Sequence, residues 1–452
     1  MHYGSYGFDL GINDQIVWRY AHLQAPLTTI GPFPDKLKLA EHVELVYAFI
    51  SPFYWVWESA KMLLLLQAAF FCASGIFVYL LARKKKLSRL VSNSLLIIYL
   101  GFYGTQNTLW ADAHSASFAA AFLMGFVYFF EAKKVFPTMI FFFLAITAKE
   151  NIGLLTFLVT FVYFVRERKK ALLLFMMVSV LYVSFIFFIF FPHVMHVHYL
   201  YQNSEGLFSN LNPLSFFDTD EKRQVIWYSL LSYGFLPLLS PLYLIPFIGD
   251  LSTYFVVANQ LPGAQGLFGQ YRISLAPLLI WSTIITLSRY KWLRNRYISV
   301  YLIICTLFVQ YALHLPLSYL VKSWFWHEPV SVKNINEVIT YLPKDASVVS
   351  QNNITPHISQ RDKIYTLYPV KKSFIKDSPC GQPTCDWFRW AGKPEYMIVD
   401  TGPDWDIRHF LANREEYITG IKNLEKGGVI KKYKQKETAT LYKILKSPAI
   451  IN

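Results

Sequence analysis

The stretch MLLLLQAAFFCASGIFVYLL at 62–81 contains no charged side chain and is the clearest signal of fold in the chain. A helix of about twenty apolar residues is long enough to cross the hydrocarbon core of a bilayer. The basic cluster RKKK follows at 83–86, and such clusters stay on the cytoplasmic side of a membrane. The stretch therefore predicts a membrane-spanning helix and the direction in which it runs.

The composition of the whole chain agrees with a membrane protein. Of its 452 residues 54% are hydrophobic and 16% are charged, whereas soluble domains carry about 25% charged residues. The net charge is +14, and further basic clusters lie between apolar runs at 133–134, 166–170 and 289–296. This spacing follows the positive-inside rule. Binding of nucleic acid needs the basic residues on one face of a soluble domain, so no nucleic-acid partner is expected.

Further apolar runs follow the first one. They lie at 90–109, 116–130, 135–165, 171–191, 273–288 and 297–315. Between them we expect a polar outer loop over 193–229, and a broken pair or hairpin over 230–248, which contains three prolines. The pattern predicts a mainly α-helical, polytopic transmembrane bundle over 61–320 with about nine or ten membrane segments.

The two flanks of this bundle are more polar. Residues 1–60 contain four prolines and scattered charge, and they predict an outer-face loop with interfacial helices. Residues 321–452 contain three β-type runs, ASVVS at 346–350, EYMIVDTG at 395–402 and ETATLYKIL at 437–445. We therefore expect a small α/β domain outside the membrane in this region.

The acidic stretch FDLGIND near the start of the chain is the first candidate site. Asp9 and Asp14 would not share a face of one helix well, but they could converge in a loop. There they could act as a general base or as metal ligands at the outer membrane surface. The alternative is that they are capping or solvated loop acids. His42, in the same outer segment, could titrate or bind a metal, or lie on a solvated interfacial helix.

Three other groups lie at the ends of apolar runs. Asp112 and His114 are two residues apart and could share a divalent ion, or Asp112 could cap the next helix. Lys149 and Glu150 interrupt two apolar runs, where charges mark function by default. They could hold a phosphate, or pair with each other in a turn. Arg272 could contact an anion, or extend its charge to the interface.

Several motifs together resemble a known family. They are FDLGINDQIVW, EHVELVYAFISPFYWVW, LLLLQA, DAH, AKENIG and SVVSQNNITPHISQRDKIY, in this order from about residue 6 to about residue 400. The sequence resembles the predicted membrane proteins of domain of unknown function 2079. That family looks like a relative of the GT-C glycosyltransferases, which take sugar from a polyprenyl-phosphate donor on the outer side of a membrane.

The resemblance also implies roles for particular residues. Asp9 takes the place of the catalytic base or metal ligand in the first outer loop. Asp112 and His114 take the place of a second acidic motif, which implies a divalent ion, Mg or Mn. Lys149 and Glu150 fall where a contact with the donor phosphate is expected. Two features depart from the family pattern. We expect no membrane helix before the first outer loop, and Gln270-Tyr271 stands where the family often has His-Tyr.

These inferences predict a glycosyltransferase that moves a sugar from a polyprenyl-phosphate donor to an unknown acceptor by inverting displacement. Asp9, or Asp14, would deprotonate the acceptor hydroxyl, and Lys149 and Arg272 would stabilise the leaving lipid phosphate. We expect an integral protein of a prokaryotic cytoplasmic membrane, in contact with membrane lipids, with its active face and its C-terminal domain extracytoplasmic.

The alternative from another class is a non-catalytic membrane protein, either a lipid or solute transporter or an inactive scaffold. A transporter predicts broken helices and charges that converge near the middle of the bilayer. The transferase predicts that Asp9, Asp112, His114 and Lys149 line one outer cavity. The depth of the charged residues therefore separates the two classes.

Overall fold

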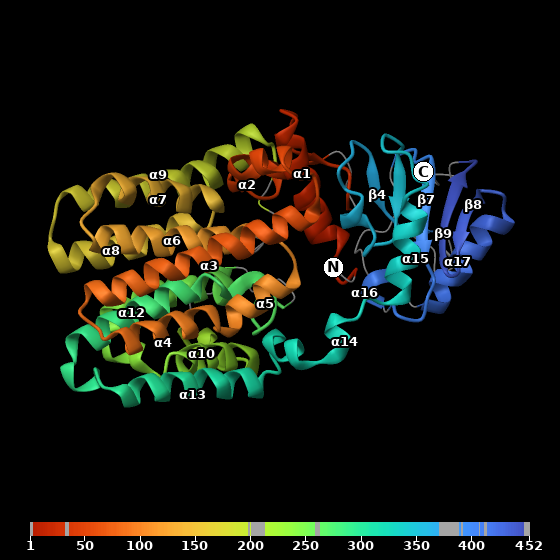
Figure 1. The fold of residues 1–452 in the computed structure, drawn as a ribbon. Helices are drawn as coiled ribbons and strands as arrows, with labels where there is room; N and C mark the ends of the chain where they lie inside the picture. Colours follow the sequence, from red (N-terminus) through yellow and green to blue (C-terminus); the bar gives the residue numbers. More distant parts are fainter. Residues whose placement is uncertain are drawn as a thin grey trace. The chain divides into compact units, whose positions relative to one another are not determined.

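A computed structural model describes residues 3–31, 36–197, 199, 213–257, 263–369, 388–389, 392–405, 407–410 and 414–446. Contacts between residues divide the chain into two compact units (Figure 1). Unit 1 comprises Met1–Lys38, Ile50–Leu63 and Ser323–Asn452, and unit 2 comprises Leu39–Phe49 and Leu64–Lys322. Each unit has its own buried apolar side chains.

Unit 2 is built of helices in the part that the structure describes. In chain order the main ones are α3 (Ala60–Lys84), α4 (Arg89–Leu100), α5 (Tyr103–Ala111), α6 (Ser115–Glu131), α7 (Val135–Ala148), α8 (Ile152–Glu167), α9 (Ala171–Ser184), α10 (Asp220–Ser232), α11 (Ile245–Ser252), α12 (Leu275–Arg289) and α13 (Arg296–Ala312). Among the described residues, three helical segments are long and apolar enough to cross a membrane, Ala60–Lys84, Ala171–Val194 and Gln270–Arg289. The predicted mainly helical bundle is confirmed, and its predicted number of membrane segments stays a prediction.

The long apolar segments differ in how deeply they are buried. In the segment that contains α12, 89% of the most apolar window is buried, so α12 lies inside the bundle. In the segment that begins with α9, only 17% is buried, and Leu174, Met177 and Leu181 of α9 are exposed. An exposed apolar face of this extent is unusual for a soluble protein and fits contact with lipid.

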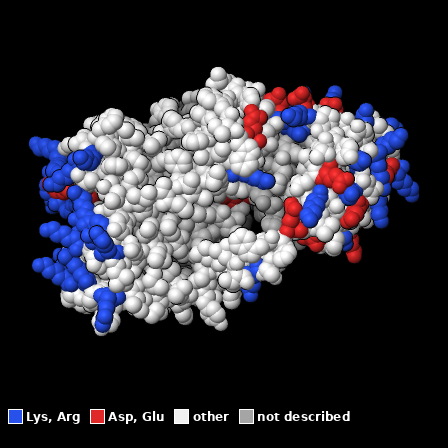
Figure 2. Space-filling view, in the orientation of Figure 1, with Lys and Arg blue, Asp and Glu red and all other residues white. Residues whose placement is uncertain are grey.

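Most of the Lys and Arg side chains that are visible on the helices of unit 2 gather at one end (Figure 2). Glu131, at the end of α6, binds Lys85 at 2.7 Å and Arg166 at 2.5 Å, so the turns after α3, α6 and α8 lie together. The predicted clustering of positive charge between helices is therefore present in the fold. That this end faces the cytoplasm stays a prediction from the positive-inside rule.

Two segments, the apolar run 90–109 and the polar loop 193–229, differ in secondary structure from the prediction. The run 90–109 is two helices, α4 and α5, because the chain turns at Gly101, whose carbonyl accepts a hydrogen bond from Gln106 Nε2 at 2.8 Å. The predicted loop 193–229 contains most of α10. Thr219 caps this helix, since its hydroxyl accepts from Lys222 N.

The proline-rich region 230–248 is broken, as predicted. Two 3₁₀ turns, η6 (Leu236–Leu239) and η7 (Pro241–Leu244), separate α10 from α11, and each turn has a proline in its first two positions. Proline lacks the N–H that an inner helix position would donate. The chain therefore passes through this part of unit 2 in short helical pieces rather than in one continuous helix.

Gly104 allows α5 to pack against the backbone before α12. A Cβ atom at this position would lie 2.6 Å from the carbonyl oxygen of Arg272, and backbone cannot yield as a flexible side chain does. We expect Gly104→Ala to destabilise the protein by about 1–3 kcal/mol, the usual cost of overpacking. Thermal unfolding of the variant in detergent measures this loss. The control is Gly263→Ala, because no atom lies within 4 Å of the added carbon there but φ is +77°. This variant measures the cost of backbone strain without overpacking. Equal stability of wild type and Gly104→Ala would contradict the expectation.

Unit 1 contains a five-stranded sheet of order β4-β3-β7-β9-β8. Its strands are β3 (Val348–Ser350), β4 (Ile364–Thr366), β7 (Tyr396–Asp400), β8 (Ile430–Lys436) and β9 (Ala439–Ile444). β3 pairs in parallel with β4 and β7, with Val348 opposite Ile364 and Tyr396, and β9 pairs antiparallel with β7 and β8. Helices α15 (Val330–Ile339) and α17 (Arg414–Lys426) supply buried side chains to its core.

The three predicted β runs correspond to β3, β7 and β9, so the α/β domain is present. Cys380 and Cys385, for which the sequence allows a disulfide, lie outside the described residues. The structure also groups residues 1–38 and 50–63 with this domain, whereas the sequence suggested a separate outer-face segment over 1–60. The difference arises from long-range contacts, such as the stacking of Tyr3 on His357 at 3.6 Å.

Candidate functional site

Asp14 lies on α1 (Ile12–Ala21) in the interior of unit 1 and is completely buried. Its Oδ1 accepts a hydrogen bond from the Tyr54 hydroxyl at 2.5 Å, and its Oδ2 accepts from the Ser359 hydroxyl and from Gln360 Nε2. Burial raises the pKa of Asp14 to about 7, although the three donors act in the opposite direction. These contacts make Asp14 a residue that holds unit 1 together.

Asp9 has a different environment in the same unit. It lies in a short π-helix, η1 (Gly7–Gly11), and its side chain is exposed. The backbone around it is fixed, because Gly7 N donates to the Asn352 carbonyl at 2.8 Å and a Cβ on Gly7 would lie 2.9 Å from Thr355. Of the two candidate bases, Asp9 is therefore the one whose carboxylate an external substrate can reach.

Gln15, beside Asp14, connects the start of the chain with the sheet of unit 1. Its Nε2 donates to Thr29 Oγ1 and to the Arg361 carbonyl, both at 3.0 Å, and its Oε1 accepts from Thr29 N at 3.0 Å. Thr29 in turn donates its hydroxyl to the carbonyl of Ile364 in β4 at 2.6 Å. The motifs FDLGINDQ and QNNITPHISQRD are thus two parts of one structure.

Asp112 and His114 lie in the connection between α5 and α6 in unit 2, and both are buried. Gln67 of α3 fixes this connection, since its Nε2 donates to the Asp112 carbonyl at 2.9 Å and its Oε1 accepts from His114 N at 3.2 Å. The alternative of Asp112 as a helix cap is wrong, because α6 begins at Ser115 with His114 in the capping position. In the part of the chain that the structure describes, no three His, Cys, Asp or Glu residues form a group suited to a metal.

Glu150 and His42 are brought together in unit 2. Glu150 is completely buried, and its carboxylate accepts from the Tyr199 hydroxyl at 2.8 Å and from Val43 N at 3.2 Å, and lies 2.7 Å from His42 Nδ1. Lys149 is half-buried. Among the described residues its ammonium forms no ion pair with Glu150 or any other group, so the predicted mutual pairing of the two residues is absent.

Arg272 precedes α12 and is completely buried, not extended to the interface. Its Nε donates to the Gly266 carbonyl at 3.0 Å and its Nη2 to the Ala264 carbonyl, and the guanidinium lies 5.1 Å from the Tyr254 ring. In the described part of the chain Nη1 has no hydrogen-bond partner. Arg272 therefore holds its own loop and keeps one donor for another group.

Asp250 of α11 is a site candidate that the sequence analysis did not identify. It is 1% exposed, and one carboxylate oxygen accepts from the Ser274 hydroxyl at 2.9 Å. Its other oxygen has no partner among the described residues. A lone acid in an apolar run, IPFIGDL, is the signal that could have found it, because buried charges inside membrane bundles are rare and functional.

The candidate groups of unit 2 lie at the end opposite to the basic turns. α6 and α7 both meet the basic turn at 132–134, so the connection before α6 and the turn after α7 lie at the other end. α12 runs from Arg272 to the basic cluster at its own end. Asp112, His114, Lys149 and Arg272 therefore share one end of unit 2. Asp9 and Asp14 belong to unit 1, and the predicted common cavity stays a prediction.

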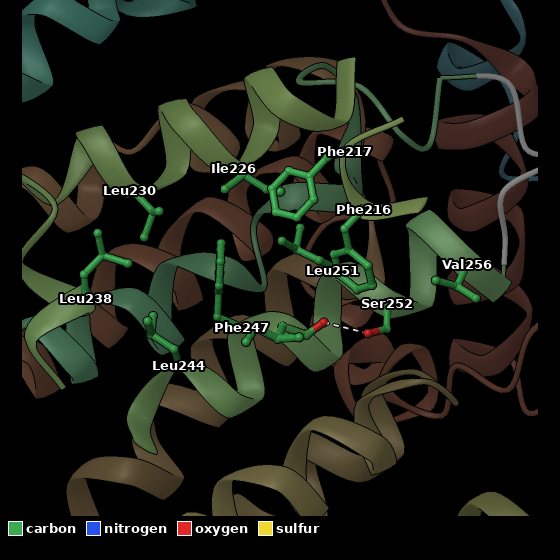
Figure 3. A pocket seen from close by; sticks show the side chains of 11 residues that line it. Phe216, Phe217, Ile226, Leu230, Leu238, Leu244, Phe247, Leu251, Ser252 and Val256 are labelled. Atoms are coloured by element: carbon green, nitrogen blue, oxygen red, sulfur yellow. Dashed lines mark hydrogen bonds between the residues drawn. The ribbon is translucent and has the colours of Figure 1, made fainter. Parts of the chain in front are cut away.

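An apolar pocket of about 540 Å³ lies elsewhere in unit 2 (Figure 3). Its lining residues are Phe216, Phe217, Ile226, Leu230, Leu238, Leu244, Phe247, Ile248, Leu251, Ser252 and Val256. The Ser252 hydroxyl donates to the Ile248 carbonyl at 2.8 Å and is thus already satisfied. The pocket volume is in the range of small-molecule sites, and its lining suits a hydrocarbon chain.

The fold and these sites define a helical membrane protein with an attached α/β domain and buried polar groups at one end of the helices. The chain belongs to the family described as "Predicted membrane protein (DUF2079)", whose sequence model matches residues 4–402. No curated protein matches the chain.

A solved structure with a similar fold is the crystal structure of ArnT from Cupriavidus metallidurans in the apo state. The TM-score is 0.51, the identity is 12%, and the match covers 97% of this chain and 93% of that chain. At this identity the likeness shows the fold alone. The shared fold supports the predicted relation of the family to the GT-C fold.

Proposed function

We propose that this protein is a GT-C-like membrane glycosyltransferase that takes a sugar from a polyprenyl-phosphate donor. The observation that carries the proposal is the ArnT-like fold along 97% of the chain, together with an exposed Asp9 in the acidic motif. A fold does not by itself define an activity. The site residues therefore supply the chemistry of the proposal.

The proposed reaction is an inverting displacement at the sugar. The Asp9 carboxylate accepts the proton of the acceptor hydroxyl while that oxygen attacks the sugar carbon, and the bond to the lipid phosphate breaks. The leaving phosphate carries the developing negative charge. Lys149, which has no ion pair in the described part of the chain, and Arg272, which keeps Nη1 available, stabilise this charge.

The residues at 112–114 allow a divalent ion but supply few ligands. Asp112 and His114 are held in place by Gln67, and they would be the protein ligands of Mg or Mn. Magnesium commonly takes only one or two protein carboxylates and completes its coordination with water and substrate phosphate. A bound ion would neutralise the charge of the donor phosphate.

The apolar pocket gives the donor a place for part of its lipid chain. Phe217, Leu238 and Ile248 on its rim are about half exposed, at 54%, 49% and 51%, whereas Leu251 and Phe247 on its floor are buried. An apolar rim that faces lipid admits hydrocarbon rather than water. Val256 in the pocket adjoins Phe255, whose ring lies 5.4 Å from the Arg272 guanidinium, so the pocket lies next to a proposed phosphate contact.

The test is transfer of radiolabelled sugar from a panel of polyprenyl-phosphate sugars in proteoliposomes that contain the full chain. We expect transfer from at least one donor, and we expect Lys149→Met to raise the KM for that donor by about tenfold or more, since a charge-assisted contact with phosphate is lost. Lys133→Met, the same change at the exposed basic end, is the matched control. Absence of transfer with every donor would contradict the proposed function.

A non-catalytic role remains the second candidate, and one observation favours it. Asp250 and Arg272 are both buried within the helical unit, and transporters likewise bury charged groups inside their helix bundles. Uptake or flipping of lipid by the proteoliposomes, without transfer of sugar, would select this candidate.

A further inference from the structure

The carboxyl ends of the parallel strands in unit 1 form a switch point of the sheet. From β3 the chain first adds β4 on one side and then returns to add β7 on the other, which gives the order β4-β3-β7. In α/β sheets, ligands bind outside the carboxyl ends of the strands where the chain reverses its direction of winding. In this sheet that place is between the end of β3 at Ser350 and the end of β7 at Asp400.

Polar side chains meet at this place. Gln351 follows β3 directly, and its Oε1 accepts from Asp400 N at 2.9 Å and from the Tyr417 hydroxyl at 3.2 Å. Asp400 Oδ1 accepts from Gly402 N at 2.8 Å. Gln351 therefore joins the loops that follow β3 and β7, and Asn353 lies two residues further along the first loop.

Several polar atoms of this set have no hydrogen-bond partner among the described residues. They are Gln351 Nε2, both amide atoms of Asn353, Asp400 Oδ2 and Trp405 Nε1. Gln351, Asn353 and Asp400 are each 0% exposed, and Trp405 is 6% exposed. A buried polar atom that stays unpaired costs about 1–3 kcal/mol, and most such atoms in proteins are paired with protein or ordered water. These five atoms at and after the ends of β3 and β7 therefore need partners that the described residues do not supply, either ordered water or a bound molecule.

The unpaired atoms define the chemistry of such a molecule. Asp400 Oδ2 needs a hydrogen-bond donor, Gln351 Nε2 and Trp405 Nε1 need acceptors, and Asn353 needs one of each. A hydroxyl group both donates and accepts, so a molecule with several hydroxyls satisfies the whole set. An amine would satisfy only the carboxylate, and an anion would be repelled by it.

The segment that carries Asp9 borders the same loops. Gly7 N donates to the side chain of Asn352 at 2.9 Å as well as to its carbonyl. The Tyr6 ring lies 5.8 Å from His409, whose ring lies 5.2 Å from Trp405. A molecule held between the ends of β3 and β7 is thus beside the π-helix that presents the exposed carboxylate.

We propose that unit 1 binds a polyhydroxylated acceptor, a sugar or polyol, at the carboxyl ends of β3 and β7, held by Gln351, Asn353 and Asp400. This proposal rests on the proposed transferase function, for which it names the class of acceptor and the site that holds it. Because the polar atoms are enclosed in this structure, binding requires the loop at 401–405, which carries Trp405, to open. Asp400 is a binding residue in this proposal, and Asp9 keeps the role of the base.

The experiment uses the full chain in lipid nanodiscs and a panel of neutral probes, namely glucose, galactose, mannose, N-acetylglucosamine and glycerol. Saturation-transfer NMR detects their binding without any sugar donor. We expect at least one probe to bind and Asp400→Asn to weaken it by about tenfold or more, because the variant places a donor where a hydroxyl must donate. Asp404→Asn, an exposed change in the same loop, is the matched control.

A second variant guards against a folding defect in the first. Trp405→Phe keeps an aromatic ring and removes only the N–H donor, and we expect it to weaken the same probe. If no probe binds, or if both variants bind as the wild type does, ordered water alone fills the site and the proposal is wrong. If a probe binds in a way that depends on Asp400 but no sugar is transferred from any donor, the binding site is supported and the proposed transferase function is wrong. Transfer whose KM for the acceptor is unchanged in Asp400→Asn would retain the transferase and overturn this site.

Discussion

Asp9→Asn is expected to abolish transfer of sugar while leaving the protein folded. Removal of a general base lowers kcat by about 10²–10⁴-fold. Asp9 is exposed, and its carboxylate forms no hydrogen bond or ion pair with another side chain that the structure describes, so the change leaves the packing of unit 1 intact. The measurement is transfer from the best donor of the panel at saturating acceptor, beside the thermal unfolding temperature of the variant.

The control for this result is Asp345→Asn, which makes the same chemical change at another exposed position of unit 1. We expect its kcat to equal that of the wild type. Binding of the donor should also survive in Asp9→Asn, because the base acts on the acceptor hydroxyl. If Asp9→Asn retains most of the wild-type kcat, Asp9 is not the base and another acidic residue must take that role.

The membrane fold could be predicted from local sequence because its signals are local. Apolar runs of spanning length and the basic clusters that end them lie next to each other in the chain. The breaks at 230–248 could be predicted for the same reason, since Pro237 and Pro241 act on their own turns. The break at Gly101 could not, because it depends on Gln106 and on the packing of Gly104 against Arg272.

In unit 1 the predictable strands are those with apolar sequences. β3 and β7 are buried and read as VVS and YMIVD. β8 was missed because IKKYKQK lies at the edge of the sheet with most side chains exposed, and its pairing with β9 comes from the partner strand. Local composition carries no information about such a partner.

The candidate site shows the same limit. FDLGINDQ and QNNITPHISQRD were both recognised as motifs, but nothing in either predicts that Asp14 binds Ser359 across 345 positions of the chain. The residues alone therefore left both Asp9 and Asp14 as candidates for the base, and only the family resemblance pointed to Asp9. Burial and hydrogen bonding separate them, and both are properties of tertiary structure.

Asp14 is expected to control the stability of unit 1. Asp14→Ala removes the acceptor of three buried donors, on Tyr54, Ser359 and Gln360. Each buried donor left without a partner costs about 1–3 kcal/mol, so we expect a loss of at least about 3 kcal/mol. Thermal unfolding of the full chain, with proteolysis within 346–366 to report on unit 1, measures this loss.

The pH dependence gives a second and independent test of the same residue. Burial raises the pKa of Asp14 from 3.8 to about 7 in the folded protein, so the folded state binds the proton more tightly than the unfolded state does. The stability contributed by this protonation is fully present below about pH 4, falls by about 1.4 kcal/mol for each pH unit above it, and is lost above about pH 7. Asp14→Asn keeps the shape of the side chain and cannot ionise. We therefore expect its stability to be independent of this titration.

The test is to measure the free energy of unfolding of the wild type and of Asp14→Asn from about pH 4 to about pH 9. If the two curves of unfolding free energy against pH are parallel, Asp14 does not titrate in this range. Transfer of sugar by Asp14→Asn adds the functional comparison, because an isosteric change at a structural residue should leave kcat near the wild-type value. Loss of transfer in a stable Asp14→Asn variant, with transfer retained in Asp9→Asn, would reverse the roles of the two acids, since a buried carboxyl with a pKa near 7 is also poised for proton transfer.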